Sequence, residues 1–370
     1  MNEKRNRVLF KSIVLLLLVV SIVMFNTIVY TNSDEILGNV TMDDNVATKS
    51  VLVSVNHIFS ELGYQMIPDY ERNLLIFLKD NNFKVILNIK SKKFLINDNG
   101  VNIEMHTDIQ TIGRKYYVPL NVLSKIVNTN KINFAENVPV LMYHHLLEKK
   151  DIKGKLVNNS AVIAVESFSQ QMKVLHEQGY TTITLDELEK YLKGEILLPK
   201  KSVLITFDDG YKSNYVYAYP LLKQYGFRAT VFIITQHIPY QMTEFNPEKL
   251  QIISWQEIKK SMDVFDFASH THDLHRLNDK NISYVICKDK EEVLKDLKLS
   301  MEILDTKYLA YPYGQYNEET LNILKELGYT LAFTIKTGKV KPGDDLLQLK
   351  RIRINPNVSI WKFKKIISVK

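Results

Sequence analysis

Two adjacent aspartates, Asp208 and Asp209, are the residues of this 370-residue chain best suited to chemistry, because they end the apolar run 203–207. Neighbouring carboxylates repel each other and lose hydration beside an apolar segment, so a cation or strong donors must stabilise them. Consecutive side chains of a strand diverge, so one carboxylate can bind an ion while the other stands beside it. Gly210 permits a sharp turn after the pair. The run predicts a metal site with an acid–base carboxylate; an aspartate that merely caps a turn is the plainer alternative.

Two histidines after a second apolar run can complete such a site. His270 and His275 lie five positions apart after the run 264–268, and on a helix they would point roughly 140° apart. A loop after a strand can fold back and bring both imidazoles to one point. With Asp209 they form a two-histidine, one-carboxylate set, which suits Zn²⁺ in hydrolysis and also Fe²⁺, Co²⁺ or Ni²⁺. We expect His272, between them, to be exposed or to support the ligands.

The elements that must position these residues alternate between strand and helix from residue 137 to the C-terminus. Such βα repeats imply parallel strands, in a barrel or a doubly wound sheet, whose carboxyl ends carry the active site. Two further strand ends are polar: the run 138–143 leads into His144 and His145, and the run 307–311 leads into Tyr313.

Helix starts are marked in this region by N-capping residues. Ser254 with Glu257 forms a capping-box pattern, and Asn317 and Ser359 are suited to capping. A helix is expected over residues 214–224. The helices and strands together predict an α/β domain over residues 137–370.

A smaller unit precedes this domain over residues 49–136. An amphipathic helix (51–62) is followed by short apolar runs typical of strands, a turn at 98–100, and a closing helix at 121–127 with Pro119 in its first turn. These patterns predict a small α+β domain.

The N-terminus is different in composition. Basic residues precede an apolar stretch from Ser12 to Tyr30, so residues 1–30 predict a cytoplasmic tip and a single membrane-spanning signal anchor, with 31–48 as a linker. No small-residue cleavage pattern follows the stretch; a cleaved signal peptide is the alternative.

The single cysteine, Cys287, excludes an intramolecular disulfide. Despite a net charge of +7, no nucleic-acid motif accompanies the scattered basic residues, so we expect no nucleic-acid partner.

The segments "TFDDG", "SHTHDLH" and "YPYG" resemble the first three motifs of the polysaccharide deacetylases, the NodB-homology or carbohydrate esterase family 4 enzymes. The resemblance implies a distorted (β/α)₇ barrel. It also implies that Asp208 is the catalytic base, that Asp209, His270 and His275 bind the metal, and that the backbone N–H of Tyr313 stabilises the oxyanion.

This chain departs from many members in its five-residue histidine spacing and in having Ala310 where an arginine usually precedes the third motif. Both departures resemble the subgroup that deacetylates poly-β-1,6-N-acetylglucosamine. In that subgroup a Tyr-His motif supplies the catalytic acid, which here corresponds to His144. Arg351 or Arg353 could replace the arginine that orients the base; solvent-exposed arginines at a strand end are the alternative.

Residues 49–136, with "YYVPLNVLSKIV", resemble the copper amine oxidase N-terminal-like domain of exported bacterial wall enzymes. His57 and His106 are isolated, so no copper site is expected there.

The patterns predict a metal-dependent, membrane-anchored enzyme whose catalytic domain is extracellular, or secreted if the N-terminal segment is cleaved, and the resemblance implies that it is an N-deacetylase. Its expected partners are the membrane and a polysaccharide containing N-acetylglucosamine, most simply the β-1,6-linked polymer. The sequence does not identify substrate-binding residues. A peptidoglycan N-acetylglucosamine deacetylase and a catalytically silent glycan-binding wall protein are the alternatives.

Overall fold

A computed structural model describes residues 50–79, 83–98 and 101–369. The predicted anchor and linker, residues 1–48, lie outside the described residues. Among the described helices, none has the length and apolar character needed to span a bilayer.

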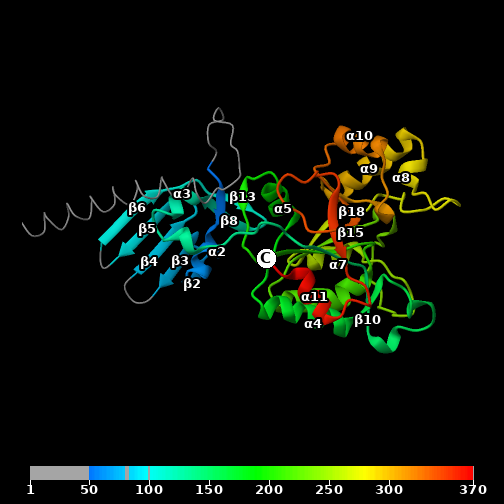
Figure 1. Ribbon diagram of the computed structural model, residues 1–370, viewed down its shortest axis with the longest axis horizontal. Helices are drawn as coiled ribbons and strands as arrows, with labels where there is room; N and C mark the ends of the chain where they lie inside the picture. Colours follow the sequence, from blue (N-terminus) through cyan, green and yellow to red (C-terminus); the bar gives the residue numbers. More distant parts are fainter. Residues whose placement is uncertain (1–49, 80–82, 99–100, 370) are drawn as a thin grey trace, which may run out of the picture. The chain divides into compact units, whose positions relative to one another are not determined.

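Seven parallel strands of the described chain close into a barrel, which confirms the predicted (β/α)₇ architecture (Figure 1). Closure is made by β9, which pairs with β14 on one side and with β19 on the other. β12 (Thr181–Thr182) pairs in parallel with the amino-terminal end of β14. The barrel strands are β9 (Val140–Tyr143), β14 (Ser202–Phe207), β15 (Ala229–Ile233), β16 (Phe265–Ser269), β17 (Tyr308–Ala310), β18 (Leu331–Thr337) and β19 (Leu349–Arg353).

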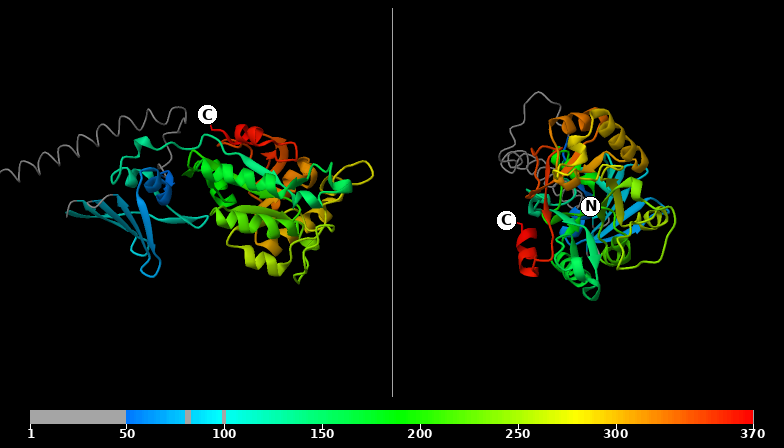
Figure 2. Two further views of the ribbon diagram at one scale, coloured as in Figure 1. Left: turned by 90° about the horizontal axis from the view of Figure 1, so that it is seen from below. Right: turned by 90° about the vertical axis from the view of Figure 1, so that its right-hand side faces the viewer.

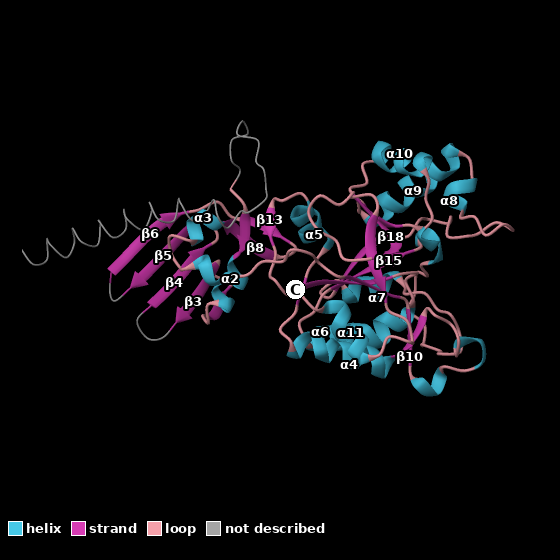
Figure 3. Ribbon diagram, in the orientation of Figure 1, coloured by secondary structure: helices cyan, strands magenta, loops and turns pink. Residues whose placement is uncertain are grey.

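Helices flank these strands (Figure 3). The capping residues predicted from the sequence are confirmed, because Ser254 and Glu257 form a capping box and Asn317 and Ser359 accept backbone N–H groups. The last helix, α11, packs against α4 on the outside of the barrel (Figure 2). The helices are α4 (Val165–Glu177), α5 (Leu185–Leu192), α6 (Tyr219–Gln224), α7 (Trp255–Ser261), α8 (Tyr284–Cys287), α9 (Lys290–Leu304), α10 (Glu318–Leu327) and α11 (Ile360–Ile367).

The structure confirms helical structure over 214–224, but it is not a single regular α-helix. A π-helical turn (Asn214–Ala218) precedes α6, and Pro220 lies in the first turn of α6. Proline has no N–H to donate and its ring crowds the preceding turn, so a regular α-helix cannot run through this position.

The N-terminal unit contains a five-stranded antiparallel sheet in the order β2-β3-β4-β5-β6. Side chains from its inner face, including Phe77 and Phe94, form a separate core with α2.

The two helices of this unit are shorter than predicted. The helix expected over 51–62 begins later, because residues 52–54 form a strand and Ser54 then caps α2. Pro119 ends β8 rather than entering a helix, and α3 is also shorter than expected. The elements are β1 (Leu52–Ser54), α2 (Val55–Glu61), β2 (Gln65–Asp69), β3 (Leu74–Lys79), β4 (Phe83–Asn88), β5 (Lys93–Asp98), β6 (Val101–His106), β7 (Gln110–Ile112), β8 (Lys115–Pro119) and α3 (Leu120–Leu123).

A second small sheet joins this unit to the barrel domain. β1 pairs with β8 and also, in parallel, with β13 (Ile196–Leu197), which follows α5. The buried carboxylate of Glu187, in α5, accepts a hydrogen bond from the Tyr117 hydroxyl at 2.6 Å and forms an ion pair with the Lys115 ammonium at 3.0 Å. Tyr117 and Leu52 belong to the same hydrophobic cluster as barrel residues. The two parts therefore share a core across the domain boundary that we predict at residue 137.

Candidate active site

Four strand ends bring the candidate residues together at one end of the barrel. Asp208 and Asp209 follow β14, His270 follows β16, His144 follows β9 and Tyr313 follows β17. The strands are parallel and neighbouring in the barrel, so their carboxyl ends lie at the same rim.

Asp209, His270 and His275 form the candidate metal site. The Asp209 Oδ1 atom lies 3.5 Å from Nε2 of His270 and 3.4 Å from Nε2 of His275. One ligand atom from each residue lies within 4.8 Å of the others. Zinc bonds of about 2.0–2.1 Å in tetrahedral geometry separate ligand atoms by about 3.3 Å, so the three groups fit one such ion.

The second nitrogen of His270 determines how this ligand is presented. Its Nδ1 lies 2.7 Å from the carbonyl oxygen of Ala310. A carbonyl only accepts, so Nδ1 carries the proton and donates, which leaves the Nε2 lone pair facing Asp209 and His275. Ala310 stands where the family that this chain resembles would place an arginine before the third motif. Here its backbone orients a metal ligand.

Burial and neighbouring charges set the ionisation of the three ligand groups. Burial opposes protonation of His270, but Asp209 and Asp208 outweigh it and raise the pKa of that imidazole. Burial opposes ionisation of Asp209, yet His270, His144 and His275 outweigh it and hold the pKa of that carboxyl well below its ordinary value. Burial, with the neighbouring His270, lowers the pKa of His275 to about 4. A carboxylate and an unprotonated imidazole are the forms that bind a metal.

The backbone at these strand ends is unusual. Asp209, Thr271 and Tyr313 have positive φ values of 69°, 75° and 57°, a region that non-glycine residues seldom occupy. Gly210 follows with a φ of 71°, and a Cβ atom there would lie 2.4 Å from Cγ1 of Ile233. Strained backbone of this kind persists where the surrounding structure imposes it, and it concentrates at functional sites.

Arg351 holds Asp208 through both carboxylate oxygens. The guanidinium donates from Nη1 to Oδ1 at 2.7 Å and from Nη2 to Oδ2 at 2.8 Å, and the Arg351 side chain is fully buried. Burial alone would raise the pKa of Asp208, but Arg351, His270 and His144 outweigh it and lower that pKa below its ordinary value. Of the two arginines considered from the sequence, the structure places Arg351 against Asp208. Arg353 is exposed.

His144 lies close to both aspartates. Burial lowers its pKa, and the charges of Asp208 and Asp209 partly oppose that shift. His145 is directed elsewhere: its Nδ1 lies 2.8 Å from Oγ of Ser213, and burial lowers its pKa to about 4.

Tyr313 closes the ligand cluster on one side. Its ring lies 4.5 Å from the His275 ring, centroid to centroid, and its hydroxyl donates to the His275 carbonyl at 3.3 Å. The side chain is 38% exposed, so it covers a ligand while facing solvent. His272, by contrast, is turned away, and its Nδ1 lies 2.8 Å from Oγ1 of Thr235.

Two contributing residues were not identified from the sequence. Tyr211 follows the aspartate pair closely, and burial together with the negative charge of Asp209 raises the pKa of its phenol. Asp296 of α9 accepts two backbone N–H groups of the histidine loop. Tyr211 could have been found from its position beside the aspartate pair. Asp296 has no local sequence signal, because it lies in an ordinary amphipathic helix.

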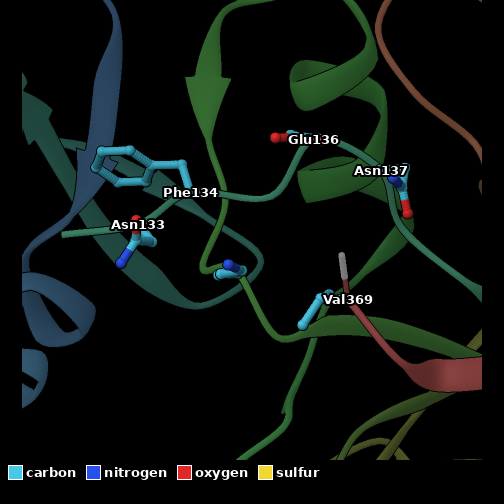
Figure 4. A pocket seen from close by; sticks show the side chains of 6 residues that line it. Asn133, Phe134, Glu136, Asn137 and Val369 are labelled. Atoms are coloured by element: carbon cyan, nitrogen blue, oxygen red, sulfur yellow. The ribbon is translucent and has the colours of Figure 1, made fainter. Parts of the chain in front are cut away.

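A small cavity of about 70 Å³ lies away from this site (Figure 4). Asn137, which lines it, precedes β9, and Lys200 precedes β14, so the cavity is at the amino ends of these strands. It therefore lies at the opposite end of the barrel from the ligand cluster.

Comparison with known proteins identifies the family. Residues 197–332 match the polysaccharide deacetylase family, and residues 38–137 match the copper amine oxidase N-terminal domain. The chain is 33% identical over 224 residues to the putative polysaccharide deacetylase YxkH of Bacillus subtilis. The match covers 60% of this chain and 73% of that protein. The chain belongs to the polysaccharide deacetylase family. This deacetylase is accordingly a hydrolase of carbon–nitrogen bonds that removes acetyl groups from a polysaccharide.

Other relatives of this deacetylase have named substrates or solved structures. It is 32% identical over 242 residues to the poly-beta-1,6-N-acetyl-D-glucosamine N-deacetylase of Staphylococcus aureus, covering 61% of this chain and 81% of that protein. The Streptococcus pyogenes deacetylase PplD in complex with acetate matches with a TM-score of 0.54 and 28% identity, over 63% of this chain and 98% of that one. IcaB from Ammonifex degensii matches with a TM-score of 0.53 and 27% identity, over 63% and 97%.

Proposed function

We propose that this deacetylase removes acetyl groups from N-acetylglucosamine units of poly-β-1,6-N-acetylglucosamine and releases acetate. The observation that carries the proposed chemistry is the division of the aspartate pair. Asp208 is held by Arg351, and Asp209 lies in the ligand triangle with the two histidines. The Staphylococcus relative named for this polymer, together with the five-residue histidine spacing, supports the choice of glycan.

In this proposal, Asp209, His270 and His275 hold one divalent ion, for which Zn²⁺ is our first candidate and Co²⁺, Ni²⁺ or Fe²⁺ are alternatives. When bound, such an ion polarises the acetamide carbonyl and lowers the pKa of a nearby water from 15.7 towards about 7.

Asp208 acts as the general base. Its low pKa keeps it ionised at neutral pH, so it is ready to accept a proton from the attacking water. Arg351 fixes both carboxylate oxygens, which restricts the direction from which Asp208 can accept that proton. Rotation of the Asp208 side chain into another rotamer would break both charge-assisted hydrogen bonds to Arg351.

His144 and Tyr313 act on the tetrahedral species in this proposal. The Tyr313 backbone N–H, in its left-handed turn, donates to the developing oxyanion. His144, in its protonated form, donates a proton to the departing sugar amine; the charges of Asp208 and Asp209 favour that form against the effect of burial on its pKa. His144 suits this role better than His145, because His144 interacts with both aspartates whereas the Nδ1 of His145 is engaged by Ser213.

Acetate release from defined β-1,6 and β-1,4 N-acetylglucosamine oligomers, with and without a chelator, tests the proposal. We expect metal-dependent release from the β-1,6 oligomers. Release only from the β-1,4 oligomers would favour a peptidoglycan N-acetylglucosamine deacetylase instead. Binding of glycans with no release from any of them would favour the silent glycan-binding protein.

The division of roles has its own test, using two isosteric changes. Asp208→Asn should leave metal affinity nearly intact and abolish turnover, because only the base is lost. Asp209→Asn should weaken metal binding, because a ligand is lost. Equal loss of metal affinity in both variants would contradict the assignment.

We further propose that the stretch from Ser12 to Tyr30 anchors the enzyme in the cell membrane with the catalytic domain outside. Its length and the basic residues before it support this topology. Accessibility of the catalytic domain to protease added outside intact cells, followed by fractionation, tests it. Protection from the protease would refute it, and recovery of a shortened soluble protein would favour the cleaved, secreted form.

A further inference from the structure

The loop from His270 to His275 must hold an uncommon shape. Its two histidines are five positions apart and converge, with ring centroids 4.5 Å from each other. Thr271, a β-branched residue, has a φ of 75° within this loop. Such a conformation is disfavoured for threonine, so contacts from outside the loop must impose it.

Asp296 supplies one side of this support. It lies on α9, is 8% exposed, and accepts the N–H of His272 at 2.8 Å and the N–H of Asp273 at 2.6 Å, one with each carboxylate oxygen. Successive backbone N–H groups beside a left-handed residue form a concave anion-binding arrangement. The carboxylate of Asp296 occupies it.

The same face of α9 makes a second contact one turn later. Oγ of Ser300 lies 2.8 Å from Oγ of Ser269, and Oγ of Ser269 accepts the N–H of Thr271 at 3.2 Å. Asp296 and Ser300 are four residues apart, so they project from one side of the helix. Thus α9 contacts the loop both before and after Thr271.

The opposite side of the loop is held by the segment after β15. The N–H of Thr235 donates to the carbonyl of Thr271 at 3.2 Å, and the N–H of Gln236 donates to the carbonyl of His272 at 3.0 Å. These bonds satisfy two carbonyl groups of the loop but none of its N–H groups. The N–H groups of His272 and Asp273 are bonded by Asp296 instead.

We propose that Asp296 is a positioning residue that fixes the curvature of the 270–275 loop and thereby sets the affinity of the site for its metal. Asp296 does not contact the ligand side chains. It acts through the backbone that carries His275 towards Asp209 and His270. The inference rests on the proposed metal-dependent function.

A purely structural role would have different consequences. If Asp296 only stabilised the fold, its loss would lower the melting temperature of the metal-free protein and leave the ligand geometry unchanged. If it positions the loop, its loss lets His275 sample several positions, and the metal dissociates more readily. Supporting residues around metal ligands commonly change affinity by about 10–100-fold.

The test compares Asp296→Ala and Asp296→Asn in the full chain, with Asp266→Asn as the matched control. Asp266 is a part-buried acid paired with Arg228, and Arg228 directly precedes β15, at the opposite end of the barrel from the ligands. Zinc dissociation constants are measured by competition with a chelating dye, and melting temperatures are measured on the metal-free proteins.

We expect zinc affinity to fall about 10–100-fold in Asp296→Ala and by less in Asp296→Asn. The asparagine oxygen can still accept one N–H, while its amide group opposes the other. Asp266→Asn should keep wild-type affinity. If the alanine variant does not fold, the asparagine variant decides. Affinity within twofold of wild type in a folded Asp296 variant would overturn the inference. Because zinc binding is measured without glycan, a wrong glycan assignment would show only in the oligomer assay.

Discussion

Replacing Arg351 with methionine should move the acid limb of the pH–rate profile to higher pH. Arg351 is the strongest of the groups that lower the pKa of Asp208, while burial acts in the opposite direction. Methionine keeps much of the apolar contact with Phe232 and Phe333, whose ring centroids lie 5.6 and 6.0 Å from the guanidinium carbon. It removes both donors to the carboxylate. The pKa of Asp208 then rises, and the base is lost by protonation at a higher pH than in the wild type.

The size of the shift follows from the two bonds. They are 2.7 and 2.8 Å long, within the range of charge-assisted hydrogen bonds. An arginine beside an aspartate typically lowers the carboxyl pKa by about 1–3 units, so we expect the limb to rise by about 2 units. Removing one partner of a buried ion pair also costs about 3–5 kcal/mol of folding stability.

The assay is kcat/KM for acetate release across pH, at saturating zinc and below the melting temperature of each variant. Arg228→Met is the control, because it removes an arginine from the Arg228–Asp266 pair at the far end of the barrel. It should lose stability without moving the limb. Arg351→Lys should give an intermediate shift, because lysine keeps the charge but loses the two-pronged geometry. A folded Arg351→Met enzyme with an unshifted acid limb would refute the role of Arg351.

Three further predictions concern other parts of the molecule. Gly210→Ala should lower both the melting temperature and the turnover, because its Cβ would lie 2.4 Å from Ile233 and its φ is 71°. Tyr117→Phe should reduce the free energy of unfolding in urea by about 1.5–3 kcal/mol, because buried Glu187 loses a donor at 2.6 Å. Zinc at about 100 times its dissociation constant should stabilise the wild type by about 2.7 kcal/mol, and Asp209→Asn should gain much less. Calorimetry would check the zinc effect.

The strand ends could be predicted from sequence because their signal is local. An apolar run that ends in Asp208 and Asp209 is chemically marked, and parallel strands necessarily bring such ends to one rim. The proline in α6 was equally visible. Its effect on the predicted helix at 214–224 could have been anticipated, since Pro220 removes a backbone donor.

The choice between Arg351 and Arg353 could not be made from the sequence. The two residues are two positions apart, so both point to the same face of a regular strand. What separates them is where the strand ends: Arg353 is the last residue of β19 and is exposed, whereas Arg351 lies inside the barrel. Asp296 could not be identified from the sequence for a related reason. Its contact with the histidine loop depends on how α9 packs on β16, and no local pattern specifies that packing.

The three left-handed residues around the ligands also bear on how this enzyme can be altered. Non-glycine residues in this region cost about 1–3 kcal/mol each, so Asp209, Thr271 and Tyr313 are local weak points in an otherwise well-packed barrel. Glycine or asparagine at Thr271 should relieve that strain. Selection for heat resistance alone would therefore favour substitutions at the catalytic rim first. Screens for more thermostable variants should measure zinc retention as well as melting temperature.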